Sequence, residues 1–301
     1  MKSRRVRRRA FSIAVAAALT GVAACSAGGS GGSGGTDRAD ARAVNRAGPV
    51  AALRSAAKST SGADSARIRS TTMGSLLSMT TRGSLAWDGG ITGTVTITCT
   101  GGSTAELMRR LGTTSMQARY LPDAYYARMS DTFAAQTGGR HWIRYGYDDL
   151  AALPGGSGGL LKDQMQNTTP DKAVQMLLAS GDVRKVGEEK ADGQATTHYA
   201  GTVRVARLAG RSSGLTASQV AALRKQLTQA GVGTETVDVW VNDRDLLVKK
   251  TEKAETATGT MTQTAHYSDY GVKADARRPP AGDTADFRTL LKRRGASGPA
   301  S

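Results

Sequence analysis

The sequence predicts an α+β domain in which several helices pack on one face of a large antiparallel sheet. The first observation is the segment 91–100, ITGTVTITCT, in which threonines alternate with small and apolar residues. This period of two, with many β-branched residues, is typical of a strand. The second observation is that turn sequences separate the strand-like segments into adjacent pairs, as in hairpins. The third is the order of helix, hairpins, helices and hairpins. A sheet with this many strands is expected to curl.

The first helix is expected to begin at Pro49. Gly48 followed by Pro49 suits a helix start, because proline lacks only a donor that the first turn does not use. Val50, Leu53 and Ala57 then recur on one stripe of the predicted helix.

Turn sequences mark four connections in the β-rich parts of the chain. Asp-Gly and Pro-Asp pairs favour tight turns, as does a short run of Asn and Asp. The connections are Asp88-Gly89, Pro122-Asp123, Asp192-Gly193 and Asn242–Asp245. Each is expected to join neighbouring antiparallel strands.

Two later helices carry start and stop signals, within residues 169–181 and 215–231. A threonine cap with proline in the first turn begins the former, and a Thr/Gln capping box begins the latter. A glycine ends each helix. The signals are Thr169, Pro170 and Gly181 for the first helix, and Thr216, Gln219 and Gly231 for the second.

The first 24 residues are expected to form a signal peptide. Six Lys and Arg residues precede an apolar stretch, 10–24, that is shorter than the roughly 20 residues a membrane-spanning helix needs. No later stretch is long and apolar enough to span a bilayer. Without those six residues, the chain has 35 Lys and Arg and 25 Asp and Glu, which gives a formal net charge of +10. This balance favours anionic lipid head groups or wall polymers, with a plain basic surface as the alternative. The scattered cations and the export signal argue against nucleic acid.

The cysteines have different expected roles. Val22-Ala23-Ala24-Cys25 resembles the lipobox of bacterial lipoproteins. That resemblance implies a diacylated Cys25 as the new N-terminus and as a membrane anchor, since two acyl chains anchor stably. An ordinary signal peptide with a chance cysteine is the alternative. The Gly/Ser-rich residues 25–48 would form a flexible tether. Cys99 is expected to be a small apolar core residue, so no disulfide framework is predicted.

The sequence argues against catalysis. The three histidines, His141, His198 and His266, lie in separate strand-like segments without metal-ligand spacing, so solvated or hydrogen-bonded side chains are expected. A G-x-S-x-G match at 155–159 lacks the preceding strand that a nucleophile elbow needs. No phosphate-binding or dinucleotide motif is present, and no cofactor is predicted.

Five stretches, taken in order, resemble exported actinobacterial lipoproteins of the LppX and LprG type, which have the LolA/LolB-like fold. The stretches are YLPDAYYARM, HWIRYGYDDL, TPDKAVQMLLASGDVRKVGEEKADGQATTHYAGTV, VDVWVNDRDLLVKKT and HYSDYGVKADARRPP. The resemblance implies a curved sheet that forms a half-barrel around helices and encloses an apolar cavity. It further implies binding of an acylated lipid or lipoglycan.

Apolar residues on the predicted helices are candidates for lining such a cavity, with plain core packing as the alternative for each. They are Leu107, Met108, Leu111, Leu160, Leu161, Met165, Val174, Leu177 and Leu178.

The expected organisation is a signal peptide at 1–24, a tether at 25–48, a single half-barrel domain at 49–290 and a disordered tail at 291–301. The expected function is a monomeric, non-enzymatic lipoprotein, anchored on the outer face of the cell membrane, that binds a lipid as carrier or chaperone. An envelope adaptor without a ligand is the second hypothesis, and a tethered hydrolase is the third.

Overall fold

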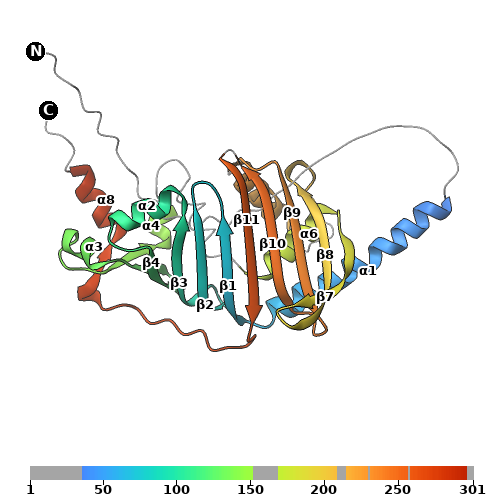
Figure 1. Ribbon diagram of the computed structural model, residues 1–301, viewed down its shortest axis with the longest axis horizontal. Coiled ribbons are helices and arrows are strands. Elements are labelled where there is room, and N and C mark those ends of the chain that lie inside the picture. Colours follow the sequence, from blue (N-terminus) through green and yellow to red (C-terminus); the bar gives the residue numbers. More distant parts are fainter. Residues whose placement is uncertain (1–35, 152–168, 209–214, 230, 257, 297–301) are drawn as a thin grey trace, which may run out of the picture.

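Twelve strands form a single open sheet in the computed structural model, which describes residues 36–151, 169–208, 215–229, 231–256 and 258–296. The order across the sheet is β12-β6-β5-β4-β3-β2-β1-β11-β10-β9-β8-β7 (Figure 1). All neighbours pair antiparallel except β12 and β6, which are parallel. The strands are β1 (Ser65–Met73), β2 (Ser78–Ala86), β3 (Thr92–Gly101), β4 (Ser115–Leu121), β5 (Ala124–Arg128), β6 (Trp142–Gly146), β7 (Arg184–Ala191), β8 (Gln194–Arg204), β9 (Thr234–Asn242), β10 (Leu247–Thr256), β11 (Gly259–Ser268) and β12 (Thr284–Asp286). The predicted α+β class is confirmed.

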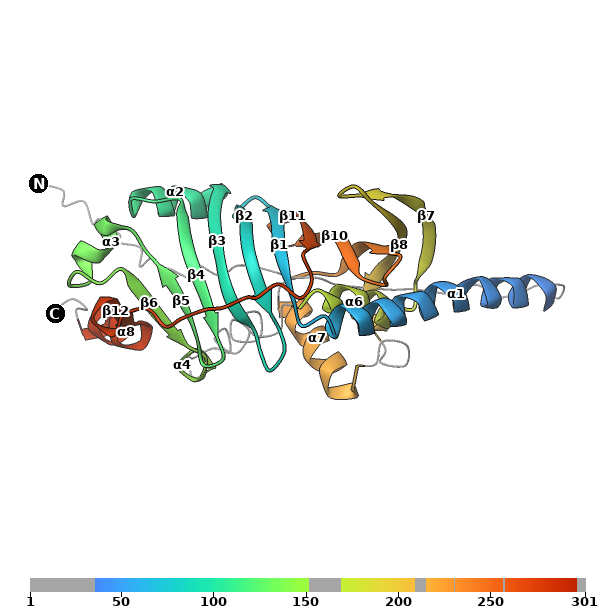
Figure 2. The same cartoon turned by 90° about the horizontal axis from the view of Figure 1, so that it is seen from below.

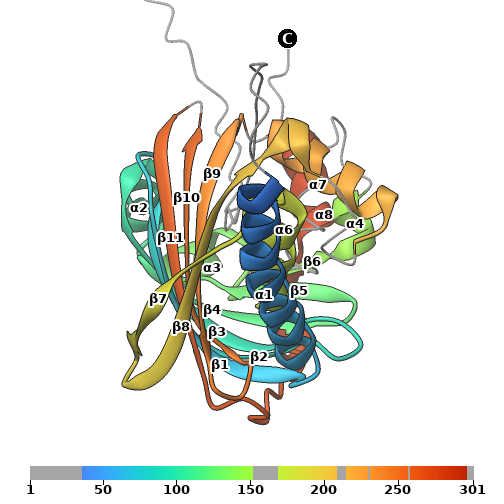
Figure 3. The ribbon, with the colours of Figure 1, turned by 90° about the vertical axis from the view of Figure 1, so that its right-hand side faces the viewer.

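Helices connect and cover this sheet. Figures 2 and 3 show α1, α6 and α7 together on one face of β7–β11. The helices are α1 (Thr36–Ser61), α2 (Gly102–Arg110), α3 (Asp131–Gln136), α4 (Tyr147–Ala151), α6 (Asp171–Ser180), α7 (Ala217–Gln229) and α8 (Phe287–Ala296), with short 3-10 turns η2 (Val205–Arg207) and η4 (Ala281–Asp283). Among the described helices, none has the length and apolar character needed to cross a membrane.

The buried residues form two main clusters. The first lies between α1, α6 and α7 and the helix-covered face of β8–β11. The second lies over β2–β6 and includes residues of α2, α3 and α4. Ile68 of β1 packs against both clusters, so β1 joins the two halves of the interior.

Local signals in the sequence predicted the hairpins and one capping box correctly. Asp192 and Gly193 have φ of 47° and 79° and connect the paired strands β7 and β8, as a type I′ turn requires. At the start of α7, the Thr216 amide donates to Gln219 Oε1 at 2.8 Å, and the Gln219 amide donates to Thr216 Oγ1 at 3.2 Å. This reciprocal pair is a capping box.

The start of α6 differs from the expectation, although its end does not. Gly181 has φ of 68° and ends the helix in the left-handed conformation. The predicted hydroxyl cap from Thr169 is replaced by a backbone contact, because the Lys172 amide donates to the Thr169 carbonyl oxygen at 3.2 Å. Pro170 occupies the N-cap position.

The helical structure extends beyond both expected ends of the domain, residues 49 and 290. Helix α1 begins at Thr36, so the second half of the expected tether is helical and Pro49 lies inside the helix. The many alanines and arginines between 36 and 48 explain this, because both are strong helix formers. Helix α8 continues to Ala296, beyond the expected domain end at 290. Phe287 and Leu290 anchor α8 by packing against the second cluster.

Candidate functional site on the helix-covered face of the sheet

Five polar residues are buried among the apolar side chains of the helix-covered face. None is more than 8% exposed, although charged residues are almost never buried without a partner. We call them the inner polar cluster: Thr72, Glu235, Lys250, Glu252 and Gln263.

The strand register places these residues on one face. In β9, Glu235 has the same phase as Val237 and Val239, whose side chains belong to the first apolar cluster. Glu252 of β10 lies opposite Val237 on one side and opposite Gln263 of β11 on the other. The cluster therefore crosses four adjacent strands, β9, β10, β11 and β1.

Four members of the cluster have partners. Lys250 Nζ lies 2.6 Å from Glu252 Oε2, and their side chains are only 10% and 8% exposed. Gln263 Nε2 donates to Thr72 Oγ1 at 3.5 Å. A buried ion pair of this kind contributes little net stability, because removing both charges from water costs about as much as their attraction returns. The pair is therefore not explained by stability alone.

Glu235 has no partner. Its side chain is fully buried, and neither carboxyl oxygen has a hydrogen-bond partner within the described part of the chain. Burial, and then the negative charge of Glu252, raise the pKa of Glu235 well above its ordinary value, and Lys250 opposes the shift. This shift favours the protonated form of the carboxyl group, whose O–H donor would have no acceptor among the described residues. Such an unsatisfied group costs about 1–3 kcal/mol.

A second polar set lies at the start of α6. Asp171 is 4% exposed and accepts a hydrogen bond from Gln175 Nε2 at 2.6 Å. The pKa of Tyr267 on β11 is raised by burial and by the charges of Glu252 and Asp171. Polar groups of α6 and of the sheet thus influence one another across the apolar interior. This arrangement suits binding of neutral polar groups, such as esters, amides or hydroxyls, next to hydrocarbon.

The predicted cavity residues fall into two groups. Val174, Leu177 and Leu178 of α6 are at most 1% exposed and pack in the first cluster, on the same side as the inner polar cluster. Met108 and Leu111 pack in the second cluster, and Leu107 of α2 is half-buried. The structure therefore does not bring the two groups into one apolar cluster. Cys25, Leu160, Leu161 and Met165 lie outside the described residues.

Sequence reasoning missed the inner polar cluster, although a signal was present. The alternation in TETVDVWV puts Glu235 in phase with the buried valines. Charged residues are normally assigned to the solvent face of a strand. Glu235, Lys250 and Glu252 are instead in phase with core residues, and this exception indicates a candidate site.

The three histidines are hydrogen-bonded and Cys99 is buried, as predicted. His141 Nδ1 lies 2.7 Å from Asp283, His198 Nε2 lies 2.7 Å from Asp238, and His266 Nδ1 lies 2.6 Å from Asp192. The described residues contain no group of three His, Cys, Asp or Glu that could hold a metal ion. Cys99 is a buried free thiol whose pKa is raised by burial, as expected of a core residue.

Comparisons with known proteins define the class. A Streptomyces coelicolor protein with the name "putative lipoprotein" is 51% identical over 304 residues, which is 96% of this chain and 98% of that protein. An uncharacterized 31.2 kDa protein encoded in the rplA-rplJ intergenic region of Streptomyces griseus is 52% identical over 256 residues, covering 84% of each chain. No protein-family model matches the chain. The chain belongs to the same family as these two Streptomyces proteins, and neither is named for an enzymatic activity.

One solved structure shows a weaker similarity to this chain. The crystal structure of the Mycobacterium tuberculosis lipoprotein LppX is 16% identical, with a TM-score of 0.44, and the match covers 76% of this chain and 99% of LppX. The likeness concerns the fold. The resemblance of the sequence to actinobacterial lipoproteins is confirmed.

Proposed function

We propose that the protein is a membrane-anchored, non-enzymatic lipoprotein that binds an amphipathic lipid between the sheet and helices α1, α6 and α7. The observation that carries the proposal is Glu235, a fully buried carboxyl group without a partner. A buried donor left unsatisfied destabilises a fold that serves packing alone, so a ligand group that accepts a hydrogen bond there accounts for it.

The chemistry of the first apolar cluster suits acyl chains. Val174 and Leu177 of α6 belong to this cluster, as do Val237, Val239 and Val241 of β9. Each CH₂ of an acyl chain that is transferred from water into such an environment contributes about 0.8 kcal/mol. The ester or hydroxyl group of the lipid would then accept from Glu235, while the Lys250–Glu252 pair provides a charged boundary nearby.

The anchor is proposed at Cys25, with the protein on the outer face of the cell membrane. Two acyl chains on Cys25 would hold the domain there, since one chain binds only marginally. Replacing Cys25 with alanine is expected to release the protein into the medium or leave the precursor unprocessed. Unchanged membrane retention of this variant would contradict the anchor.

Native mass spectrometry tests lipid binding. The chain from residue 25 onward, with Cys25→Ser, would be purified without detergent and compared with the same chain carrying Glu235→Leu. The expected result is a co-purifying lipid mass that is lost or reduced in Glu235→Leu. Glu106→Gln, which changes an exposed acid on α2, is the matched control and should keep the lipid. A clean ligand-free mass under gentle conditions would contradict the proposal and favour the adaptor hypothesis.

A further inference from the structure

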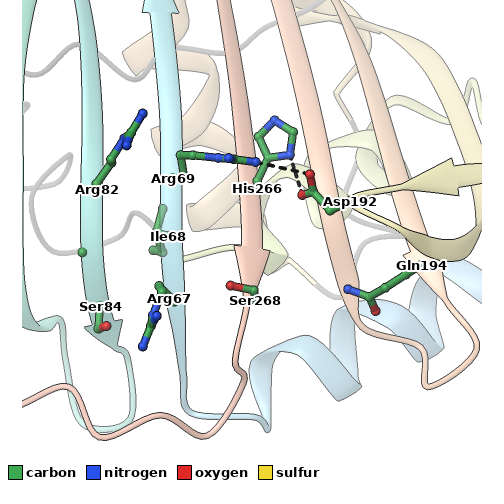
Figure 4. A pocket seen from close by; sticks show the side chains of 10 residues that line it. Arg67, Ile68, Arg69, Arg82, Ser84, Asp192, Gln194, His266 and Ser268 are labelled. Atoms are coloured by element: carbon green, nitrogen blue, oxygen red, sulfur yellow. Dashed lines mark hydrogen bonds and ion pairs between the residues drawn. The ribbon is translucent and has the colours of Figure 1, made fainter.

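A pocket of about 710 Å³ lies on the other face of the sheet, formed by β1, β2, β11 and the β7–β8 turn (Figure 4). Ile68 of β1 points into the apolar interior, so its neighbours Arg67 and Arg69 point to the opposite face. The β7–β8 turn reaches this face because the sheet curls, and Asp192 of the turn and Gln194, the first residue of β8, line the pocket. We call this site the arginine pocket. It is separate from the inner polar cluster.

The pocket carries more positive than negative charge. Arg67, Arg69 and Arg82 line it, and Asp192 is its only acidic lining residue. Asp192 lies 3.3 Å from Arg69 Nη2 and 2.6 Å from His266 Nδ1. Arg67 Nε pairs with Asp269, just outside the pocket, at 3.2 Å. The acidic lining of the arginine pocket therefore does not balance the positive charge of its three arginines.

Arg82 is the uncompensated cation. It lies directly opposite Arg69 in the register of β1 and β2, and it is exposed. Within the described ranges, its side chain makes no hydrogen bond or ion pair. Like charges directly opposite one another on neighbouring strands destabilise a sheet. The fold gains nothing from this pair, whereas an anion between the two guanidinium groups would remove the repulsion.

A further cation, Lys249, lies along the same row of the sheet. Arg82, Arg69 and His266 occupy one register position on β2, β1 and β11. Lys249 of β10 follows opposite His266, with its Nζ 3.9 Å from the centre of the Trp240 ring. Adjacent strands are about 4.8 Å apart, so the row extends about 14 Å. This length suits a ligand larger than a single ion.

Asp192 shows which anion can bind. Its carboxylate already occupies the space between Arg69 and His266, so a ligand must carry more charge than a carboxylate to replace it. A phosphate monoester carries about −1.5 to −2 at neutral pH. Its oxygens also match the fork of an arginine, which binds phosphate through two parallel hydrogen bonds. Asp192 and Gln194 line one side of the pocket, so the site is concave and a flat bilayer surface is a poor fit.

We propose that the arginine pocket binds the phosphate monoester group of a soluble ligand, with Arg82 and Arg69 as its main partners. The inference does not depend on lipid binding at the inner polar cluster. Isothermal titration calorimetry of the full mature chain with glycerol 3-phosphate, at constant ionic strength, tests it. Acetate is the comparison anion. The expected result is binding of glycerol 3-phosphate and little or none of acetate.

Three variants assign the site. Arg82→Ala is expected to weaken binding about ten-fold or more, the loss typical of a hydrogen bond to a charged group. Arg140→Ala removes an exposed arginine near β6, five strands away from β1, and should leave binding unchanged. Asp192→Asn keeps the positive φ of the turn and removes the competing charge, so it should tighten binding.

Thermal unfolding in phosphate-free buffer separates folding from binding. Arg82→Ala should have an unchanged or higher Tm, because it removes a cross-strand repulsion. No heat with millimolar glycerol 3-phosphate would overturn the proposal. So would equal losses in Arg82→Ala and Arg140→Ala, which would indicate non-specific attraction. Binding to vesicles of anionic phospholipid without binding to glycerol 3-phosphate would overturn it in favour of a membrane surface.

Discussion

Replacing Glu235 with glutamine should remove a pH dependence from the stability of the protein. In the folded state, burial holds the pKa of this carboxyl well above the ordinary value of 4.5. The folded protein therefore keeps a proton that the unfolded chain releases above that value. Because the folded state binds more protons, the free energy of unfolding falls as the pH rises. The contribution is fully present below pH 4.5 and is lost as the pH approaches the raised pKa.

The size of this pH dependence follows from the binding of a single proton to Glu235 in the folded state. Between the ordinary and the raised pKa, the wild-type protein loses about 1.4 kcal/mol of unfolding free energy per pH unit relative to Glu235→Gln. For a domain of this size, that corresponds to a difference in Tm of about 3–6 °C per pH unit. Thermal unfolding followed by circular dichroism from about pH 5 to pH 8 measures this difference in Tm between the wild type and Glu235→Gln. Glu106→Gln is the control and should run parallel to the wild type. If Glu235→Gln also runs parallel, the carboxyl is ionised or partnered in solution and the reasoning is wrong.

Three further predictions concern the buried ion pair, the packing of a glycine and a helix cap. Glu252→Leu should destabilise the protein by about 3–5 kcal/mol in chemical denaturation, because it leaves Lys250 buried without a partner. The double variant Lys250→Met with Glu252→Leu should cost much less, because no buried charge is left unpaired. A larger loss in the double variant would contradict this. Gly201→Ala should destabilise by about 1–3 kcal/mol or more, because its Cβ would lie 1.7 Å from the Asp182 carbonyl oxygen, while Gly187→Ala meets nothing within 4 Å and should be close to neutral. Equal effects of the two would refute the packing argument. Thr216→Ala should cost about 1 kcal/mol through loss of the capping box, and an unchanged midpoint of denaturation would show that the cap contributes nothing.

Local chemistry made much of the fold predictable. Turn residues and caps act over a few positions, so Asp192-Gly193 and the Thr216–Gln219 capping box could be identified from sequence alone. The expected start of α1 at Pro49 is wrong, because the helix propensity of the preceding alanines and arginines outweighs the proline signal.

The candidate site depends on long-range geometry that sequence patterns do not contain. Alternation shows that Glu235 shares a phase with Val237, but only the sheet order brings it to the same face as Lys250 and Glu252. The arginine pocket is less predictable still. Asp192 and His266 are 74 residues apart, and they meet because the curl of the sheet carries the β7–β8 turn over β11.

Photocrosslinking tests the central claim most directly. A diacyl lipid with a diazirine group in one acyl chain would be bound to the full mature chain and irradiated, and the modified peptides would be identified by mass spectrometry. We predict adducts on α6 and on the helix-covered residues of β9–β11, and fewer adducts in Glu235→Leu. Adducts confined to exposed surfaces, or no saturable labelling, would contradict a lipid site between the sheet and the helices.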